Sequence, residues 1–151
     1  MFKYKVRPAS VADFPALRKL KERLYGSPIT KSRVEAVYKN TLADAGQAVF
    51  VAVHSGNVVG YIHARQVTAL FEERYTEIAE IAVYDYYADK NACSELVSAV
   101  EKWSAQMLSS SVRINVHDGK QMEMLLNIGF HGSRRGGLEK IIYSERKNCY
   151  E

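Results

Sequence analysis

The sequence contains little cysteine and no long apolar run. Its two cysteines, Cys93 and Cys149, lack the paired spacing of a thiolate metal site. No stretch approaches the roughly 18 consecutive apolar residues of a membrane-spanning helix, and no apolar segment follows the basic residues at the start. We therefore expect no metal site, no membrane association and no signal peptide. Free thiols in a reducing compartment are the simpler expectation, which favours a cytoplasmic protein.

Basic residues are also not concentrated in any one segment. The net charge is +4, but lysine and arginine are spread over the N-terminal third and the C-terminal tail. Nucleic-acid binding is therefore not expected, because such proteins gather their bases on one face together with aromatic residues. One segment has the opposite charge: residues 72–89 hold six acidic residues and a single arginine. This acidic segment is either a solvated rim or a surface that attracts a cationic or amine-bearing substrate.

What the sequence does contain is ordinary for a globular protein, with 47% hydrophobic and 25% charged residues. A chain of 151 residues is long enough to bury a full core. We find no internal repeat, low-complexity segment or linker. The sequence therefore predicts a single domain over residues 1–151.

The hydrophobic periodicity changes repeatedly between that of strands and that of helices. It predicts helices from Asp13 to Gly26 and over 30–42, 91–108 and 119–130, with Ser10 and Asp13 forming a capping-box-like start. It predicts strands over 2–9, 48–54, 58–67, 75–83, 111–117 and 138–145, with a further short one near 130–133. This order predicts a mixed α/β fold, in which a central mixed sheet carries helices on both faces.

One segment, "IAVYDYYADKNACSELV" from Ile81 to Val97, has the layout of a phosphate-binding turn. A strand leads through a tight loop into a helix, whose first backbone N–H groups and positive dipole end attract anions. The loop carries Asp89, Lys90 and Asn91 where such loops are rich in glycine. Two interpretations remain open: an altered anion cradle, or a helix start capped by the side chain of Asn91 or Asp89.

The element order and two segments resemble the GNAT superfamily of acyl-CoA-dependent N-acetyltransferases. "IAV" followed by the loop and "SELVSAVEKWSAQ" resembles the strand, loop and long helix that bind acetyl-CoA in that family. "INVHDGKQMEMLLNIGF" is similar to the family's strand, asparagine-led loop and helix ending in "LGF". The resemblance spans nearly the whole chain. It implies the GNAT acyl-CoA N-acyltransferase fold, acetyl-CoA as co-substrate, and a gap between the fourth and fifth strands that holds the pantetheine arm.

The resemblance also implies which residues contact acetyl-CoA. They are Ile81, Ala82, Val83, Ala88, Asp89, Lys90, Asn91, Ala92, Cys93, Ser94 and Asp118. Several depart from the family pattern: Asn91 stands at a glycine position, Cys93 at a glycine-or-alanine position, and Ala88 at the position of a basic or amide residue. Asn91 tolerates a positive φ better than most residues, so the backbone shape is expected to persist. Lys90 would offset the negative charge of Asp89.

Two further departures concern the second segment. Asp118 stands where many family members have asparagine, and Leu125 stands where they have the tyrosine that protonates the departing thiolate. A leucine cannot donate a proton, so we expect Leu125 to lie in the core.

For catalysis the sequence offers Glu80 and His117. Glu80 lies on the expected central strand, where it would take the proton of the attacking amine directly or through water. Regular strand alternation places Glu77 on the opposite face, so only one of the two carboxylates would serve. His117 closes the fifth strand, and its ordinary pKa suits acid or base chemistry near neutral pH. His63, on the third strand, is expected to be structural or to face the substrate.

These observations favour transfer of an acetyl group to a primary amine of a small molecule, such as an aminoglycoside or a polyamine. The alternative is a GNAT-fold binding or interaction protein that has lost catalysis, because the glycines and the tyrosine of the motif are missing. A homodimer is compatible with the sequence.

Overall fold

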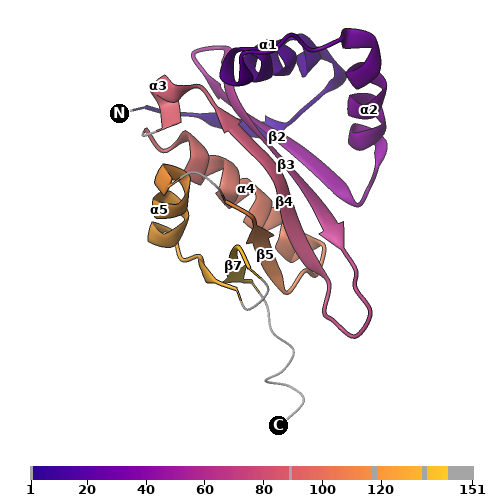
Figure 1. The fold of residues 1–151 in the computed structure, drawn as a ribbon, viewed down its shortest axis with the longest axis vertical. Coiled ribbons are helices and arrows are strands. Elements are labelled where there is room, and N and C mark those ends of the chain that lie inside the picture. The colour runs from indigo at the N-terminus through magenta and orange to yellow at the C-terminus, as the bar shows by residue number, and fades with distance from the viewer. Residues whose placement is uncertain (1, 89, 117–118, 134–135, 143–151) are drawn as a thin grey trace.

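The computed structural model describes residues 2–88, 90–116, 119–133 and 136–142. Its strands form one seven-stranded sheet in the order β1-β2-β3-β4-β5-β7-β6 (Figure 1). The strands are β1 (Lys5–Pro8), β2 (Gln47–His54), β3 (Asn57–Val67), β4 (Tyr75–Val83), β5 (Ser111–Ile114), β6 (His131–Gly132) and β7 (Leu138–Ile141). The helices are η1 (Val11–Asp13), α1 (Phe14–Tyr25), α2 (Lys31–Ala43), α3 (Asp85–Ala88), α4 (Ala92–Gln106) and α5 (Gly119–Asn127).

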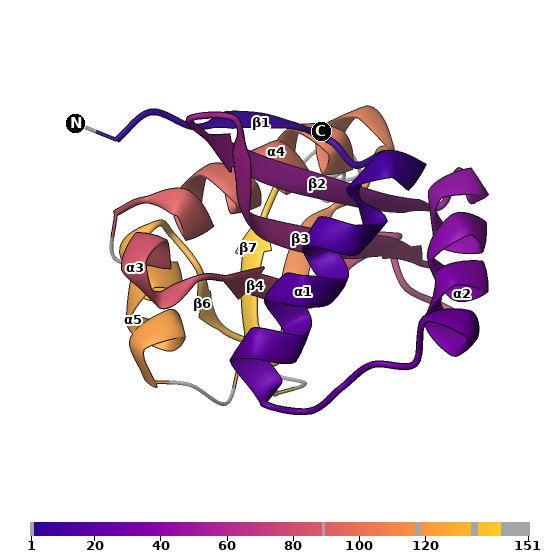
Figure 2. The ribbon, with the colours of Figure 1, turned by 90° about the horizontal axis from the view of Figure 1, so that it is seen from above.

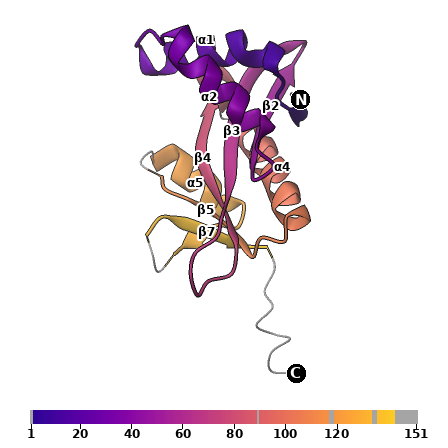
Figure 3. The ribbon, with the colours of Figure 1, turned by 90° about the vertical axis from the view of Figure 1, so that its right-hand side faces the viewer.

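The sheet is mixed and carries helices on both faces, which confirms the predicted fold class. Among the described strands, β4 and β5 form a parallel pair and the other neighbouring strands pair antiparallel. Helices α1 and α2 cover one face and α4 covers the other (Figure 2). The long strands β3 and β4 run from the α1–α2 side to the end where β5 and β7 lie (Figure 3). None of the described helices combines the length and apolar character needed to cross a bilayer.

Each face has a separate core. On the α4 face, Leu96, Val97 and Val100 are fully buried against Ile62 of β3 and Val112 of β5. On the α1 face, the smaller core is built from α1 and from β2, β3 and β4. Its buried members are Leu17, Leu20, Val49, Val51, Tyr61 and Ala82.

Local sequence signals explain where several elements begin and end. The carboxylate of Asp13 accepts a hydrogen bond from the backbone N–H of Ser10 at 2.8 Å, as expected for the start of the first helix. Gly26 ends α1 with a φ of 69°, a left-handed conformation that glycine adopts without a steric penalty. Ser55 and Gly56 both have positive φ in the β2–β3 turn, which is typical of a tight hairpin.

The structure differs from the sequence expectation in two places near the loops. The turn α3 forms within the segment that the sequence predicted as loop. Strand β5 ends at Ile114, three residues before the predicted end at His117, because its pairing with both neighbours stops at Ile114. The predicted last strand, 138–145, begins at Leu138 as expected, and its predicted end lies outside the described residues.

Strand β4 contains a β-bulge. On β3, His63 lies opposite Glu80 but the next residue, Ala64, lies opposite Ile78, so Ala79 has no partner on β3. An extra residue of this kind bends the strand and changes which side chains share a face. The bulge lies in the strand whose side chains were predicted to alternate regularly between the two faces.

The bulge puts Glu77 and Glu80 on the same face of the sheet. Arg65 and His63 lie two residues apart on β3 and therefore share a face. Their cross-strand partners, Glu77 and Glu80, share that face too. The prediction that these two carboxylates point to opposite faces is therefore wrong, because strand alternation fails at a bulge.

Strands β4 and β5 separate directly beside the bulge. They pair at three positions, Thr76 with Val112, Glu77 with Arg113 and Ile78 with Ile114. Strand β4 continues to Val83, and no described strand pairs with that part of it on the β5 side. The predicted gap between the fourth and fifth strands is confirmed.

A network of buried hydroxyl groups ties the far end of β4 to α4. The hydroxyl of Thr76 accepts hydrogen bonds from Ser104 at 2.7 Å and from the Gln66 amide at 2.9 Å, and it donates to Ser109 at 2.9 Å. Thr76, Ser104 and Ser109 are all fully buried. Buried hydroxyls require such partners, so this network fixes the end of α4 against the sheet.

Replacing the central hydroxyl of this network should destabilise the protein. We expect Thr76→Val to lower the free energy of unfolding by about 1–3 kcal/mol, because the shape is kept while buried polar partners are lost. Thr76→Ser keeps the hydroxyl and should cost less than Thr76→Val. Urea denaturation followed by circular dichroism measures both. A Thr76→Val variant as stable as the wild type would contradict this role for the network.

Candidate functional site

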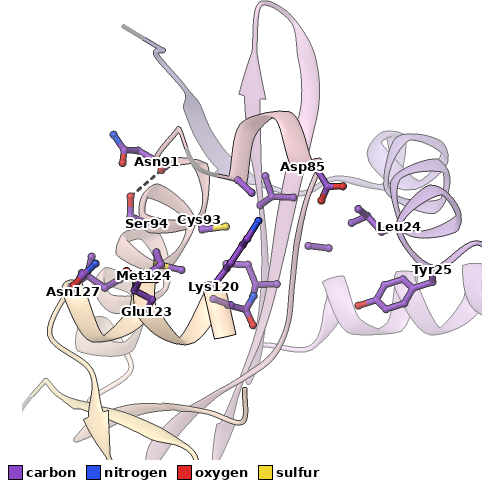
Figure 4. Close-up of a pocket in the computed structure, with 16 residues that line it drawn as sticks. Leu24, Tyr25, Asp85, Asn91, Cys93, Ser94, Lys120, Glu123, Met124 and Asn127 are labelled. Carbon is purple, nitrogen blue, oxygen red and sulfur yellow. Dashed lines mark hydrogen bonds between the residues drawn. The ribbon is translucent and has the colours of Figure 1, made fainter. Parts of the chain in front are cut away.

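A cavity of about 840 Å³ opens where β4 and β5 separate. It lies between the end of β4, the start of α4, the helix α5 and the C-terminal end of α1 (Figure 4). The residues that line it are Leu24, Tyr25, Ile81, Ala82, Val83, Asp85, Ala88, Asn91, Cys93, Ser94, Lys120, Gln121, Glu123, Met124, Asn127 and Ile128.

Most of the residues predicted to contact acetyl-CoA meet in this cavity. Those that line it are Ile81, Ala82, Val83, Ala88, Asn91, Cys93 and Ser94. Ala92 is instead fully buried in the core behind the first turn of α4. The ammonium of Lys90 binds the carbonyl of Tyr86 at 2.8 Å and lies over the Tyr86 ring, and Lys90 is not among the residues that line the cavity. Asp89 and Asp118 lie outside the described residues.

Asn91 adopts a backbone conformation that glycine takes readily. Its φ and ψ are 70° and 7°, in the left-handed region that asparagine tolerates better than most residues. Its side chain makes no hydrogen bond that caps α4, so the interpretation of Asn91 as a capping side chain is not supported. Its carbonyl accepts a hydrogen bond from Ser94 Oγ at 3.0 Å (Figure 4). The predicted positive φ at this position is therefore confirmed.

Glu80 lies on the α1 face of β4, beside the cavity and not within its lining. One carboxylate oxygen accepts a hydrogen bond from Tyr61, and the other forms an ion pair with Lys21 at 2.5 Å. The hydroxyl of Tyr25, which does line the cavity, lies 3.4 Å from the same oxygen as Lys21. Burial and the hydrogen bond to Glu80 raise the pKa of Tyr61, so this phenol stays protonated.

Of the two candidate histidines, only His63 lies within the described residues, and His117 lies outside them. His63 is half-buried opposite Glu80, and its Nε2 atom lies 2.7 Å from the side-chain oxygen of Gln47. Burial, together with the charge of Arg65, lowers the pKa of His63 below its ordinary value of 6.5. The ring is therefore neutral at neutral pH.

Three of the five described carboxylates in the acidic segment 72–89 form ion pairs. Glu77 binds Arg65 at 2.5 Å, Glu80 binds Lys21 at 2.5 Å and Glu72 lies 4.0 Å from Arg113. These carboxylates are distributed along the length of β4 and the turn before it. The described part of this segment therefore does not form a single unpaired acidic surface.

The sequence interpretation missed the contribution of α5. Lys120, Glu123, Met124 and Asn127 line the cavity from this helix, and Figure 4 shows Lys120 extending between Cys93 and the pair Leu24 and Tyr25. Their spacing of three or four residues is the signal that could have identified one helical face. The neighbouring Leu125 is fully buried, which confirms the prediction that it belongs to the core.

The fold and the cavity can be compared with known proteins. The chain matches the model of the acetyltransferase (GNAT) family over residues 14–126. Because this match covers most of its length, the chain belongs to the GNAT acetyltransferase family, whose members use acetyl-CoA. No match was found among curated protein sequences.

Solved structures share the fold at low sequence identity. A putative acetyltransferase from Agrobacterium tumefaciens is 22% identical with a TM-score of 0.78, over 87% of this chain and 96% of that one. An aminoglycoside 6′-N-acetyltransferase from Acinetobacter baumannii is 17% identical with a TM-score of 0.74, over 88% and 94%. An aminoglycoside acetyltransferase from a soil metagenome, solved with sisomicin, is 15% identical with a TM-score of 0.71, over 82% and 86%. These likenesses establish the fold and leave the acceptor open.

The left-handed conformation of Asn91 leads to a stability test. We expect Asn91→Gly to be about as stable as the wild type. We expect Asn91→Ala to lower the free energy of unfolding by roughly 1–2 kcal/mol, because alanine is strained in the left-handed region of φ and ψ. Asn40→Ala, an exposed position within α2, is the matched control and should be neutral or stabilising. Thermal and urea unfolding measure the three variants. Equal stability of Asn91→Ala and the wild type would argue against this backbone conformation.

Proposed function

We propose that this chain is an acetyl-CoA-dependent N-acetyltransferase that acts on a primary amine of a small molecule. The observation that carries the proposal is the part of β4 beyond Ile78, which has no described partner on its β5 side and whose residues Ile81–Val83 line a cavity bounded by the first turn of α4. This arrangement supplies backbone groups for an extended chain and a helix N-terminus for a pyrophosphate, the two parts that acetyl-CoA presents. Membership of the GNAT family supports the same assignment.

In this proposal the pantetheine arm lies along Ile81–Val83 and takes the place that β5 leaves open. The pyrophosphate lies at the start of α4, near Cys93 and Ser94. Lys120 extends into the cavity from α5 and adds a positive charge for the phosphates or for the sulfur. A backbone N–H near Val83 would contact the carbonyl oxygen of the acetyl group.

The reaction needs a base for the amine and a place for the negative charge on sulfur. The amine nitrogen forms a bond to the acetyl carbon while the carbon–sulfur bond breaks, and Glu80 accepts the amine proton directly or through water. The proton returns to the thiolate when CoA leaves. Leu125 cannot supply it, and the ammonium of Lys120 is the described cation placed to stabilise the thiolate. His117 stays a prediction for the acid.

A second candidate function follows from the burial of Leu125. Its side chain is fully enclosed in the core, so the proton donor common in the family is missing at this position. A protein that binds acyl-CoA without turning it over would have this arrangement. Binding of acetyl-CoA without acetylation of any amine would favour this function over catalysis.

Acetyl-CoA binding can be tested at the first turn of α4. We expect Ser94→Glu to weaken acetyl-CoA binding at least about tenfold, because a carboxylate would face the phosphates. An acidic residue in the first turn favours the helix, so a loss of affinity would not reflect unfolding. Ser98→Glu, one turn further along α4 and outside the cavity lining, carries the same charge change as the control. Isothermal titration calorimetry measures all three proteins. No binding by the wild type at millimolar ligand would contradict the proposal.

Catalysis can be tested at Glu80. We expect Glu80→Gln to lower kcat by about 10²–10⁴-fold with little change in acetyl-CoA affinity, because the amide cannot accept the amine proton. Glu77→Gln is a matched control, since this carboxylate lies on the same strand and the same face but binds Arg65. Steady-state kinetics with an amine panel measures both variants, with thermal melting as the check on folding. Equal losses in the two variants would remove Glu80 from the mechanism.

A further inference from the structure

A second cavity, of about 370 Å³, lies between α1, α2 and the sheet. Glu80, which is not in the lining of the larger cavity, forms part of the wall of this second cavity together with Tyr61 and His63. Its volume is at the lower end of the range for small-molecule sites. The rest of its wall is mainly apolar, with Phe14, Leu17, Ile29, Val34, Val37 and Val49.

The packing of α2 explains why this space is hollow. None of the residues of α2 is buried, although Val34 and Val37 line the cavity and Val37 is 63% exposed. A helix that lies over a sheet normally buries its apolar side chains against it. Tyr38 and Leu42 of α2 pack partly buried against the α1-face core, whereas Val34 and Val37 line the apolar space beside Glu80.

The charges in this cavity do not suit a polycation. Among its described lining residues Glu80 is the one carboxylate, and it is already paired with Lys21 at 2.5 Å. The other charged group is the cation Arg18, which binds Glu22 and the carbonyl of Ile29. His63 is neutral at neutral pH because burial lowers its pKa. A second ammonium would therefore enter an apolar space with two cations and no carboxylate left to receive it.

Glu80 connects this apolar space to the proposed acetyl-CoA site. Tyr25 lines the larger cavity and lies 3.4 Å from the Glu80 carboxylate, which lines the smaller one. Ala82, two residues further along β4, lines the larger cavity and packs in the α1-face core with Tyr61. An amine beside Glu80 would thus lie between the two cavities, with the rest of its molecule directed under α2.

We propose that the acceptor is a small monoamine with one apolar group, aliphatic or aromatic, and that this group fills the cavity under α2. The inference rests on the proposed acetyltransferase function and narrows its acceptor. It replaces the expectation of an aminoglycoside or polyamine that the acidic segment raised, because Glu80, the one carboxylate in the described lining of this cavity, is already paired with Lys21.

Two amines of nearly the same size test the chemistry of this cavity. Hexylamine and cadaverine have equal numbers of heavy atoms but differ at one end, which is a methyl group in hexylamine and a second ammonium in cadaverine. We expect kcat/KM with acetyl-CoA to be at least about tenfold higher for hexylamine. Cadaverine, spermidine or an aminoglycoside acetylated as efficiently as hexylamine would overturn the proposal.

Filling the cavity tests its location. We expect Val34→Trp to lower kcat/KM for hexylamine by about tenfold or more and to leave acetyl-CoA affinity and methylamine turnover unchanged. Ala36→Trp, an exposed position of α2 outside the lining, is the matched control. Val37→Trp is the second variant, since an exposed valine can be replaced without loss of core packing. Unchanged hexylamine kinetics in both lining variants would overturn the proposal.

A binding measurement separates this inference from the proposed function. Saturation-transfer NMR on the full chain without acetyl-CoA measures whether hexylamine binds to the protein. A signal in the wild type that is lost in Val34→Trp and kept in Ala36→Trp supports the cavity even if no amine is acetylated. Absence of that signal in the wild type overturns the proposal, whether or not acetyl-CoA binds.

Discussion

In a parallel pair of strands, the backbone N–H and C=O groups of one strand bind those of the other. Strand β5 pairs with β4 at only three positions. Beyond Ile78 the edge of β4 continues alone to Val83. A backbone edge without a strand partner must bind water or a ligand. The position of the larger cavity follows from this one constraint, because the space appears where the two strands separate.

The bulge at Ala79 is closely linked to this separation. It comes directly after Ile78, the last residue of β4 that pairs with β5, and reverses the alternation of the side chains that follow. As a result, Glu80 is turned toward α1, where Lys21, Tyr25 and Tyr61 surround its carboxylate. The bulge therefore lies beside the point where β4 leaves β5. It also directs the carboxylate of Glu80 to the α1 face of the sheet.

The strands, helices and fold class were predictable because they depend on local periodicity. The range 75–83 was predicted with both ends correct, and the stop of α1 at Gly26 came from the residue type. The bulge was not predictable, since alanine at position 79 carries none of the usual glycine signal for such a feature. Strict alternation then assigned Glu77 to the wrong face.

The candidate site was predicted only where it is contiguous in sequence. Residues 81–94 could be read from one strand, loop and helix start, and Asn91 was predicted to keep a glycine-like backbone because asparagine tolerates positive φ. The partners of Glu80 could not be read in this way. Lys21 lies 59 positions away, and nothing local in the sequence links it to β4. For the same reason, the acidic segment looked like a surface for cations until its bases were located.

The three-pair connection between β4 and β5 also divides the sheet mechanically. Strands β1 to β4 form a broad antiparallel part, and β5, β7 and β6 form a narrow one, with α4 packed across both. Among the described residues, direct strand pairing between the two parts is limited to these three positions. A molecule that occupies the space between β4 and α5 touches both parts at once and holds them together, so its binding energy also appears as resistance to unfolding.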